Sequence, residues 1–388
     1  MHADVIIIGA GPTGLCLAIA LAQAGLKSIV LERLALTAIA QPAFDGREIA
    51  LTHESRHLLH QWGIWDRIHP NDVSDLRHAQ VLDGPASSGM TIHAELGQKK
   101  QLGWLVPNHV LRQAAYDSMA QQDRVQLITD ALIERTQVHA NYAEVGLSNG
   151  QTLRAPLLVA ADSRFSETRR AMGIQAHVRD FGKSMMVFRV KHSQPHHHIA
   201  WEWFGYGQTR ALLPLNDQCA SVVLTLNPSS MQQLLALPAE EFDTNISERY
   251  EFRLGAMQRI SERFVYPLVG VYATQFHAHR FALIGDAAVG MHPVTAHGFN
   301  LGVGSVAGLA QHVIAAYRAG QDLADPKRLA AYTRQHHQRC LPLFAATNLV
   351  VSLYTNDLPP VRAVRQAILK AANSLTPFKR FIATRLTG

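Results

Sequence analysis

Two short segments of the chain carry glycines and polar side chains suited to binding a dinucleotide. The first is GAGPTG at residues 9–14, which follows the apolar run DVIII and precedes a helical pattern. Gly9 permits a tight turn, Gly11 lets the backbone approach a pyrophosphate, and Gly14 allows close helix–sheet packing. The N–H groups at the start of the helix then face the phosphates. This segment predicts a bound dinucleotide.

An acidic residue supports the same interpretation. Glu32 ends the next apolar segment, SIVLE, where its carboxylate can accept hydrogen bonds from ribose hydroxyls. Arg33 beside it is a further candidate cofactor-binding residue. The sequence has one such fingerprint, because the similar glycines at 302, 304 and 308 fall inside a helical pattern and indicate close helix packing.

The late segment GDAAVGMHPVTAHGFN, residues 285–300, predicts a second contact with the same ligand. Asp286 follows the strand-like run FALIG and can accept a hydrogen bond from a sugar-like hydroxyl. Gly298 and Asn300 begin a helix whose N–H groups and dipole favour negative charge. A reduced flavin is negative on its pyrimidine side. We therefore expect a flavin that is held at one end by each segment.

Three residues of the late loop are candidate catalytic residues. Pro293 stiffens the loop, and His292 and His297 flank the proposed position of the flavin ring. A histidine there could transfer a proton or donate a hydrogen bond to a substrate. A purely structural role in loop packing is equally compatible with the sequence.

Two further polar triplets, Asp45-Gly46-Arg47 and Asp162-Ser163-Arg164, lie next to predicted helices or strands. Arg47, in Asp45-Gly46-Arg47, could reach the flavin, its phosphates or an acidic substrate, or could cap a surface loop. Asp162 follows the apolar strand LLVAA, at the sheet edge where ligands bind in α/β folds. A turn-forming role for Asp162 is the alternative.

The sequence predicts no metal site. The chain has 21 histidines, but His196, His197 and His198 form a run that indicates a loop, and no HExxH motif is present. The 3 cysteines make no CxxC, zinc or disulfide pattern, which favours a reducing compartment.

The periodicity predicts an α/β protein with a discontinuous Rossmann-like domain. A parallel sheet is assembled from early, middle and late segments, a mainly antiparallel substrate sheet is inserted, and a helical region closes the chain. Helices are expected at 299–320 and 327–340. The predicted ranges are 1–74, 106–180 and 274–330 for the cofactor domain, 75–105 and 181–273 for the substrate sheet, and 331–388 for the C-terminal region.

Composition fits an ordinary globular protein of 388 residues, with 47% hydrophobic and 17% charged residues and a net charge of +6. The excess of positive charge lies at the C-terminus, where no acid follows Asp357. That tail could contact a membrane surface or a partner, or could dock on the core. The absence of a long apolar run predicts no spanning helix, and the expected location is cytoplasmic, with peripheral contact on the inner face of the membrane as an option. The basic residues of the tail are Arg362, Arg365, Lys370, Lys379, Arg380 and Arg385.

Taken together, these motifs resemble the FAD-dependent aromatic hydroxylases of the para-hydroxybenzoate hydroxylase type. The resemblance covers nearly the whole chain and is strongest to the ubiquinone-biosynthesis hydroxylases (the UbiH/UbiF/VisC group). It rests on DVIIIGAGPTG, LE at 31–32, DGREIALTHESRHLLHQWGIWDRI, VPNHVLRQAA, ADSRFSETR and GDAAVGMHPVTAHGFNLG.

The resemblance implies bound FAD, NAD(P)H as the transient reductant, and a prenylated phenol as the substrate. It implies that Glu32 binds the adenosine ribose, that Asp286 binds the ribityl chain, and that Arg47 and Arg112 contact FAD. Asp162 matches the Asp of the family's middle motif. The chain departs from the family pattern at Ser163, usually Gly, at Ala296-His297, usually Gly-Gln, and at Ser305, usually Asp.

The predicted reaction is hydroxylation of an aromatic ring through a C4a-hydroperoxide of the reduced flavin. The alternatives are a flavin dehydrogenase or prenyl reductase that needs no oxygen, and a non-catalytic flavoprotein of a biosynthetic complex. Possible partners are proteins of ubiquinone biosynthesis, and no nucleic acid is expected.

Overall fold

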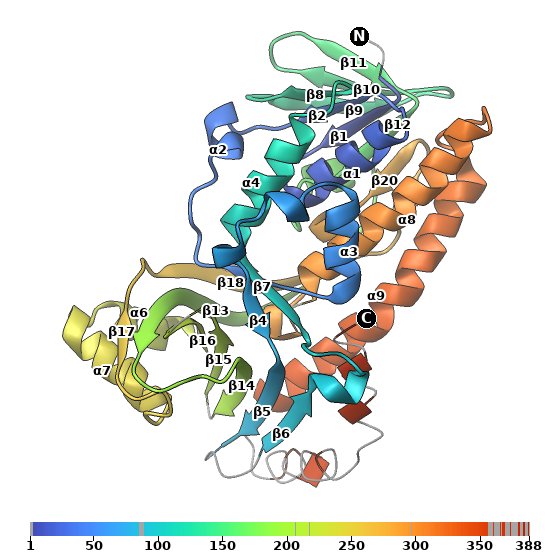
Figure 1. Ribbon diagram of the computed structural model, residues 1–388. Coiled ribbons are helices and arrows are strands. Elements are labelled where there is room, and N and C mark those ends of the chain that lie inside the picture. The colour runs from blue at the N-terminus through green and yellow to red at the C-terminus, as the bar shows by residue number, and fades with distance from the viewer. Residues whose placement is uncertain are drawn as a thin grey trace.

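The computed structural model describes most of the chain (Figure 1). The described residues are 3–84, 89–205, 207–216, 218–295, 297–355, 360, 365, 367, 368, 373, 379, 380, 383, 384 and 387. The fold is mixed α/β, as predicted. Two large sheets form its two halves, and long C-terminal helices run along both of them (Figure 1).

The first half is built on a six-stranded sheet assembled from distant segments. Its order is β19-β20-β12-β1-β2-β8, and every neighbouring pair is parallel except β19 with β20. Its central strands are fully buried apolar runs, which is typical of a parallel sheet covered on both faces. The strands are β1 (Val5–Ile8), β2 (Ser28–Leu31), β8 (Val125–Ile128), β12 (Leu157–Ala160), β19 (His277–Ala278) and β20 (Phe281–Leu283).

Helices and a small sheet cover this parallel sheet. α1 (Pro12–Gln23) packs against both α4 (Asn108–Met119) and α8 (Gly298–Arg318). Residues 133–155 form a small antiparallel sheet of order β11-β10-β9, and the chain then enters β12. Its strands are β9 (Ile133–Val138), β10 (Ala143–Leu147) and β11 (Thr152–Ala155).

The second half is a nine-stranded sheet. Its order is β21-β18-β13-β16-β15-β14-β5-β6, with β17 paired to β13, and only the pair β14–β5 is parallel. The strands are β5 (His78–Asp83), β6 (Gly89–His93), β13 (Ala176–His192), β14 (Ile199–Gly205), β15 (Gln208–Pro214), β16 (Cys219–Leu226), β17 (Met257–Arg259), β18 (Phe264–Ala273) and β21 (Val289–Gly290).

A third, three-stranded sheet lies between the two halves (Figure 1). Its order is β3-β7-β4, from β3 (Glu48–Leu51), β7 (Gly103–Pro107) and β4 (Ser74–Leu76). The remaining elements are α2 (Leu36–Ala40), α3 (His53–Gln61), α5 (Glu167–Ala171), and the 3-10 turns η1 (Trp65–Arg67), η2 (Pro70–Asp72), η3 (Ala94–Gly97), η4 (Gly285–Ala287) and η5 (Pro293–Thr295).

Two stretches differ from the sequence-based expectation. Residues 228–249, expected within a sheet, form α6 (Pro228–Leu235) and α7 (Ala239–Arg249). They cover the outer face of the large sheet, where Met231 and Phe242 join its apolar core. Helix α9 (Pro326–Thr355) is longer than predicted and continues through Pro342.

The C-terminal region also changes two expectations. Helix α8 is long and apolar enough to cross a membrane, whereas the sequence predicted no such helix, but it is mostly buried between α1 and α9. Arg365 is buried and forms an ion pair of 2.9 Å with Asp83, which supports docking of the tail at that position. Among the predicted basic residues, Arg362, Lys370 and Arg385 lie outside the described residues.

Candidate functional site

The glycine-rich loop between β1 and α1 leaves space for a phosphate group. Gly9 has a positive φ of 106°, and a Cβ there would lie 2.5 Å from the carbonyl oxygen of Ala161. A Cβ on Gly14 would overlap the carbonyl oxygen of Gly9. In contrast, a Cβ on Gly11 would meet no described atom within 4 Å, and Gly11 caps α1 without a side-chain hydrogen bond. The N–H groups at the N-terminus of α1 are therefore accessible, as binding of a dinucleotide pyrophosphate requires.

Glu32 holds the same loop at the end of β2. Its carboxylate accepts hydrogen bonds from the backbone N–H of Ala10 at 2.9 Å and of Leu34 at 3.0 Å. Each carboxylate oxygen can accept a second hydrogen bond, so the group remains able to bind a ribose hydroxyl. Arg33 is exposed beside it.

The early and late segments meet around the side chain of Thr13. A Cβ on Gly285 would lie 2.7 Å from Thr13 Oγ1, and a Cβ on Gly302 would lie 2.7 Å from Thr13 Cγ2. Ser305 fixes the turn, because its hydroxyl accepts from Gly285 N at 3.0 Å and donates to Gly302 O at 2.5 Å. The close packing predicted for the glycines of α8 is therefore observed at Gly302.

The middle segment, Asp162-Ser163-Arg164, and the late segment are joined by an ion pair. Arg164 Nη2 donates to Asp286 Oδ2 at 2.9 Å, and Arg164 Nη1 donates to Val269 O at 3.0 Å. Asp162 Oδ2 accepts from both the N–H and the hydroxyl of Thr168. Asp162 Oδ1 is buried and has no hydrogen-bond partner among the described residues. A buried acceptor without a donor is unfavourable, and a ligand hydroxyl or amide would satisfy it.

The start of α8 is tied to the third sheet. Asn300 Oδ1 accepts from Thr52 N at 3.1 Å, and its Nδ2 donates to Ala50 O at 2.8 Å. A Cβ on Gly298 would meet no described atom within 4 Å. Asn300 thus positions the helix on β3, while the space in front of Gly298 suits approach of a ligand to the helix N-terminus.

Arg47 and Arg112 make different contacts. Arg47 pairs with Asp45, which also accepts from Asn108 Nδ2 at 2.7 Å, and the Arg47 guanidinium lies 5.4 Å from the ring centroid of Tyr266. Arg112 donates to Ala38 O, within α2, at 3.4 Å. These contacts place Arg47 between the start of β3 and β18 of the large sheet, and Arg112 beside α2 in the first half.

His292 lies against the large sheet. Its ring packs edge-to-face on Phe181, with the ring centroids 4.7 Å apart. Its Nδ1 accepts a hydrogen bond from the backbone N–H of Val294 at 3.2 Å. Burial lowers the pKa of His292 to about 4, and the charges of Arg179, Lys183 and Arg164 act in the same direction. The ring is therefore neutral at pH 7, with Nε2 carrying the proton. This state permits hydrogen-bond donation but makes His292 a poor proton source near neutral pH.

A small, largely enclosed cavity lies beside His292. It is formed by the inner face of the large sheet, the late loop and α9. Pro293 is exposed at the start of η5, and His297 occupies the N-cap position of α8. Ala296 lies outside the described residues. The residues that line the cavity are Phe181, Lys183, Phe204, Thr209, Thr225, His292, Val294 and Val351.

Two acidic residues near the sheet were not predicted as site residues. Glu202 is two residues before Phe204 on β14, so both side chains point to the face that lines the cavity. Its register neighbours are Val81 and Ala211, and burial raises the pKa of Glu202 to about 8. Alternation in the run IAWEWFG gave a usable signal, because Glu202 is the one acid among large apolar residues.

The second is Glu48 on β3, which is paired with Arg189 on β13 at 2.7 Å. Burial raises the pKa of Glu48 to about 7, although Arg189 opposes that shift. The pair links the third sheet to the large sheet beside Arg47. Since it joins residues far apart in the sequence, spacing alone gave no sign of it.

Comparison with known proteins gives consistent results. The family model described as FAD binding domain matches residues 2–345. Ubiquinone hydroxylase UbiM of Neisseria meningitidis is 42% identical over 100% of this chain and 85% of its own length. Ubiquinone hydroxylase UbiL of Rhodospirillum rubrum is 34% identical over 100% of this chain and 90% of its own length.

Solved structures share the fold. The crystal structure of p-nitrophenol 4-monooxygenase PnpA from Pseudomonas putida superposes with a TM-score of 0.80, at 19% sequence identity. The match covers 100% of this chain and 98% of that one. The discontinuous arrangement of a parallel sheet and an inserted antiparallel sheet is therefore an established architecture.

Proposed function

Because the chain belongs to the FAD binding domain family, we propose that it is an FAD-dependent monooxygenase that hydroxylates a prenylated phenol in ubiquinone biosynthesis. The observation that carries the proposal is similarity over the whole chain to proteins named ubiquinone hydroxylases. The uncapped glycine loop and the unpaired Asp162 Oδ1 support FAD as the group that is bound.

Each end of the cofactor site has its own residues. The N-terminus of α1 and Gly11 would bind the pyrophosphate, and Glu32 would bind the adenosine ribose. Asp286, oriented by Arg164, would bind the ribityl chain, and the N-terminus of α8 would stabilise negative charge on the ring. When bound, FAD supplies the redox and oxygen chemistry, with NAD(P)H as the reductant, which the side chains of this chain cannot supply.

The substrate ring would lie between the late loop and the large sheet. Apolar and aromatic side chains such as Phe181 and Phe204 exclude water from this region. His292 would donate a hydrogen bond from Nε2, and His297 would orient or deprotonate the phenol. The protein's part in the reaction is thus to position the ring and to keep the site dry.

The role of His297 gives a first prediction. His297→Ala should leave FAD binding intact but uncouple NAD(P)H oxidation from product formation, because the phenol is no longer oriented. The measurement is the ratio of hydroxylated product to NAD(P)H consumed. His177→Ala, on an exposed part of β13, is the control. An unchanged ratio in the His297 variant would remove this role.

Glu202 gives a second prediction. At pH 7 its carboxyl holds a proton and can donate to a phenol oxygen, and it ionises as the pH rises through about 8. Glu202→Gln should keep the coupling ratio within about twofold at pH 7 and abolish the change near pH 8. Glu202→Ala should lower the ratio at both pH values. The same pH profile in wild type and the Gln variant would show that Glu202 does not contact the substrate.

The function is tested by the product. The purified protein should be yellow, and NAD(P)H oxidation should increase on adding a prenylated phenol in air. In a strain that lacks the gene, mass spectrometry should detect an accumulated ubiquinone precursor that lacks one hydroxyl group. Turnover without oxygen would instead favour a dehydrogenase or prenyl reductase. Bound FAD without substrate-stimulated oxidation would favour a non-catalytic flavoprotein.

The substrate class suggests where the protein works. A prenylated phenol partitions into membranes, so we infer peripheral contact with the inner face of a membrane or with partner proteins of the same biosynthesis. Arg380 and Ile368 are exposed tail residues that could make such contacts. Flotation with liposomes before and after removal of residues 360–388 tests this inference, and unchanged flotation would exclude the tail.

A further inference from the structure

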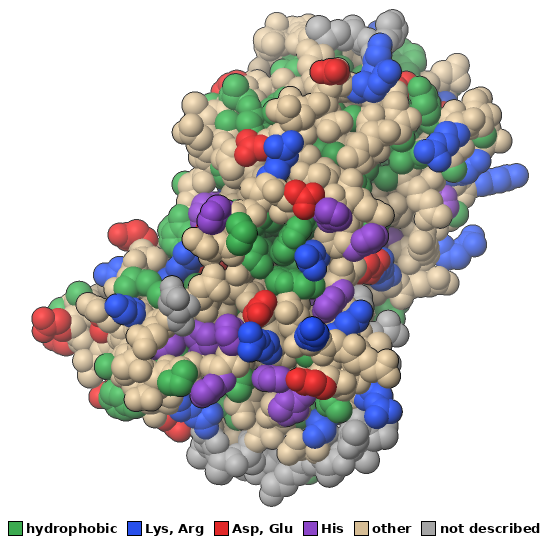
Figure 2. Space-filling model, in the orientation of Figure 1, with side chains coloured by type: hydrophobic (Ala, Val, Ile, Leu, Met, Phe, Trp, Pro, Cys, Tyr) green, Lys and Arg blue, Asp and Glu red, His purple; other side chains and the backbone are tan. Residues whose placement is uncertain are grey.

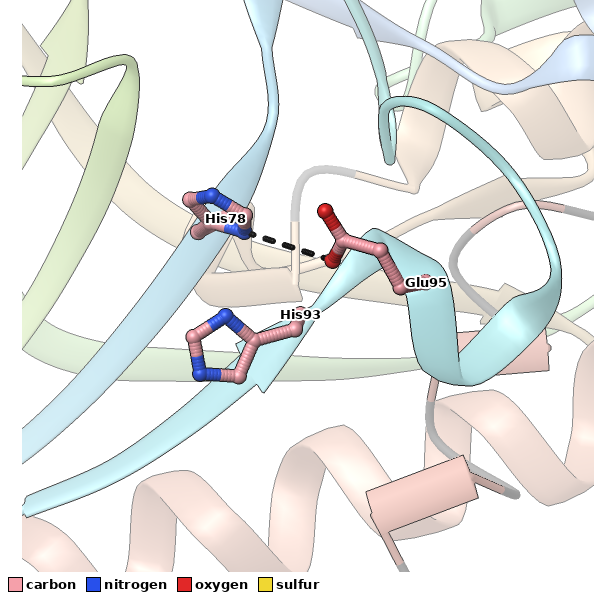
Figure 3. A group of neighbouring side chains, drawn as sticks. All are labelled: His78, His93 and Glu95. Atoms are coloured by element: carbon pink, nitrogen blue, oxygen red, sulfur yellow. Dashed lines mark ion pairs between the residues drawn. The ribbon is translucent and has the colours of Figure 1, made fainter.

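A group of potential metal ligands lies on the outer face of the large sheet, away from the proposed flavin site. Histidine side chains cross the lower half of the face shown in Figure 2. Among them, His78 on β5 and His93 on β6 are directly opposite each other in an antiparallel pair. Glu95 follows in η3, and the ligand atoms of all three residues lie within 4.8 Å of one another (Figure 3).

The distances and hydrogen bonding suit a cation shared by the three side chains. The two imidazole ring centroids are 4.8 Å apart, and Glu95 Oε2 lies 4.0 Å from His78 Nδ1, beyond hydrogen-bonding distance. His78 Nδ1 is buried and has no hydrogen-bond partner among the described residues. An imidazole nitrogen without a hydrogen bond offers a lone pair that can bind a cation.

We propose that His78, His93 and Glu95 bind one divalent transition-metal ion of the zinc class. Two imidazoles and one carboxylate are a typical ligand set for such ions, with water in the remaining position. Tetrahedral coordination brings ligand atoms to about 3.3 Å from one another. The ligand atoms must therefore move closer together than the 4.8 Å observed. This movement is feasible because Glu95 is 67% exposed and His93 is exposed, so both side chains can rotate.

The ion would have a structural role. It would connect the β5–β6 hairpin with η3, and η3 contacts the C-terminal region, since a Cβ on Gly97 would lie 3.1 Å from Thr387 Oγ1. Metal binding would therefore stabilise the edge of the sheet on which the tail docks. The sequence predicted no metal site, because these ligands are brought together by strand pairing and not by a local motif.

The experiment uses the untagged, FAD-loaded protein after treatment with a chelating resin. Titration with Zn²⁺ by calorimetry should show one high-affinity ion per chain. Titration with Co²⁺ should give visible absorption bands beyond 500 nm, outside the main flavin bands, with the intensity of a four-coordinate site. Zn²⁺ should also raise the midpoint of thermal unfolding without changing the FAD content.

Variants identify the ligands. His78→Gln and His93→Gln should each weaken Zn²⁺ binding at least tenfold and remove the Co²⁺ bands, and Glu95→Gln should weaken binding in the same direction. His197→Gln is the matched control, because His197 is an exposed histidine of the neighbouring 196–198 run. Retained Co²⁺ bands in the His93 variant, or equal loss in the control, would overturn the proposal. A retained flavin spectrum in every variant separates loss of metal from loss of fold.

Discussion

At the scale of single residues, Ser163 in the middle segment adopts a backbone conformation that usually requires glycine. Ser163 has a φ of 81°, a region that residues with a Cβ rarely adopt. The conformation turns the chain between Asp162, which accepts a hydrogen bond from Thr168, and Arg164, which pairs with Asp286. The departure from the family pattern at this position therefore changes the side chain and its energetic cost, and not the course of the backbone.

Ser163→Gly should stabilise the protein. Relief of the positive-φ strain is worth about 1–2 kcal/mol, and the greater backbone entropy of glycine offsets roughly 0.5–1 kcal/mol of it. Urea unfolding should show a net gain of about 0.5–1 kcal/mol. Ser148→Gly, at an exposed turn serine without positive φ, should lose stability. A loss in the Ser163 variant of the same size as in the control would refute the strain argument.

At the scale of elements, α1, η4 and α8 are packed through glycines that tolerate no added atoms. Thr13 is β-branched and is held between Gly285 and Gly302, so it cannot move aside. Further along α8, a Cβ on Gly308 would lie 3.5 Å from Tyr332 of α9, an ordinary van der Waals contact. The two glycines share a helix but differ in the space beside them.

This contrast predicts opposite effects of one substitution. Gly302→Ala should destabilise the protein and weaken FAD binding, because overpacking costs about 1–3 kcal/mol and displaces Thr13 beside the phosphate loop. Gly308→Ala should stabilise the protein by about 0.5–1 kcal/mol, since alanine favours the helix interior. Urea unfolding and FAD titration measure both effects. If Gly302→Ala were as stable as Gly308→Ala, the contact with Thr13 would not be restrictive.

The elements also show how far the sequence could be read. Strong periodicity and glycine spacing predicted β1, α1, β2, β12 and α8 because these signals are local. The helices α6 and α7 lie within a stretch that was expected to form a sheet, and α9 extends beyond the predicted end at residue 340. Pairings such as Glu48 with Arg189, and His78 with His93, depend on sheet register and tertiary contact, which spacing in one sequence does not encode.

At the scale of the whole molecule, C-terminal helices hold the two halves together. Tyr272 of the large sheet donates or accepts a hydrogen bond at 2.8 Å with His337 of α9, and Tyr332 of α9 donates to Leu283 O of the parallel sheet at 2.6 Å. Between them His336 is buried beside Phe276 and Cys340. Burial lowers the pKa of His336 to about 3, so its imidazole ring is neutral when it is packed at this junction.

This junction should make the fold sensitive to acid. The folded pKa of His336 is about 3 against an ordinary 6.5, so the unfolded chain binds the proton first as the pH falls. Above pH 6.5 the neutral His336 ring adds no penalty to the free energy of unfolding. Below pH 6.5 that free energy falls progressively, and at pH 5 this one group lowers it by about 2 kcal/mol. His292, with a pKa of about 4, should contribute in the same direction.

Urea unfolding at pH 7 and pH 5 tests this argument, with the difference between the two free energies of unfolding as the readout. His336→Gln cannot titrate, so its difference should be smaller than that of the wild type by about 2 kcal/mol, even if its stability at pH 7 is lower. His292→Gln should reduce the difference separately, and the two effects should add because the residues lie on different elements. Equal pH dependence in wild type and the His336 variant would mean that α9 separates from the two sheets before the molecule unfolds, so that His336 is already exposed in the state that accepts the proton.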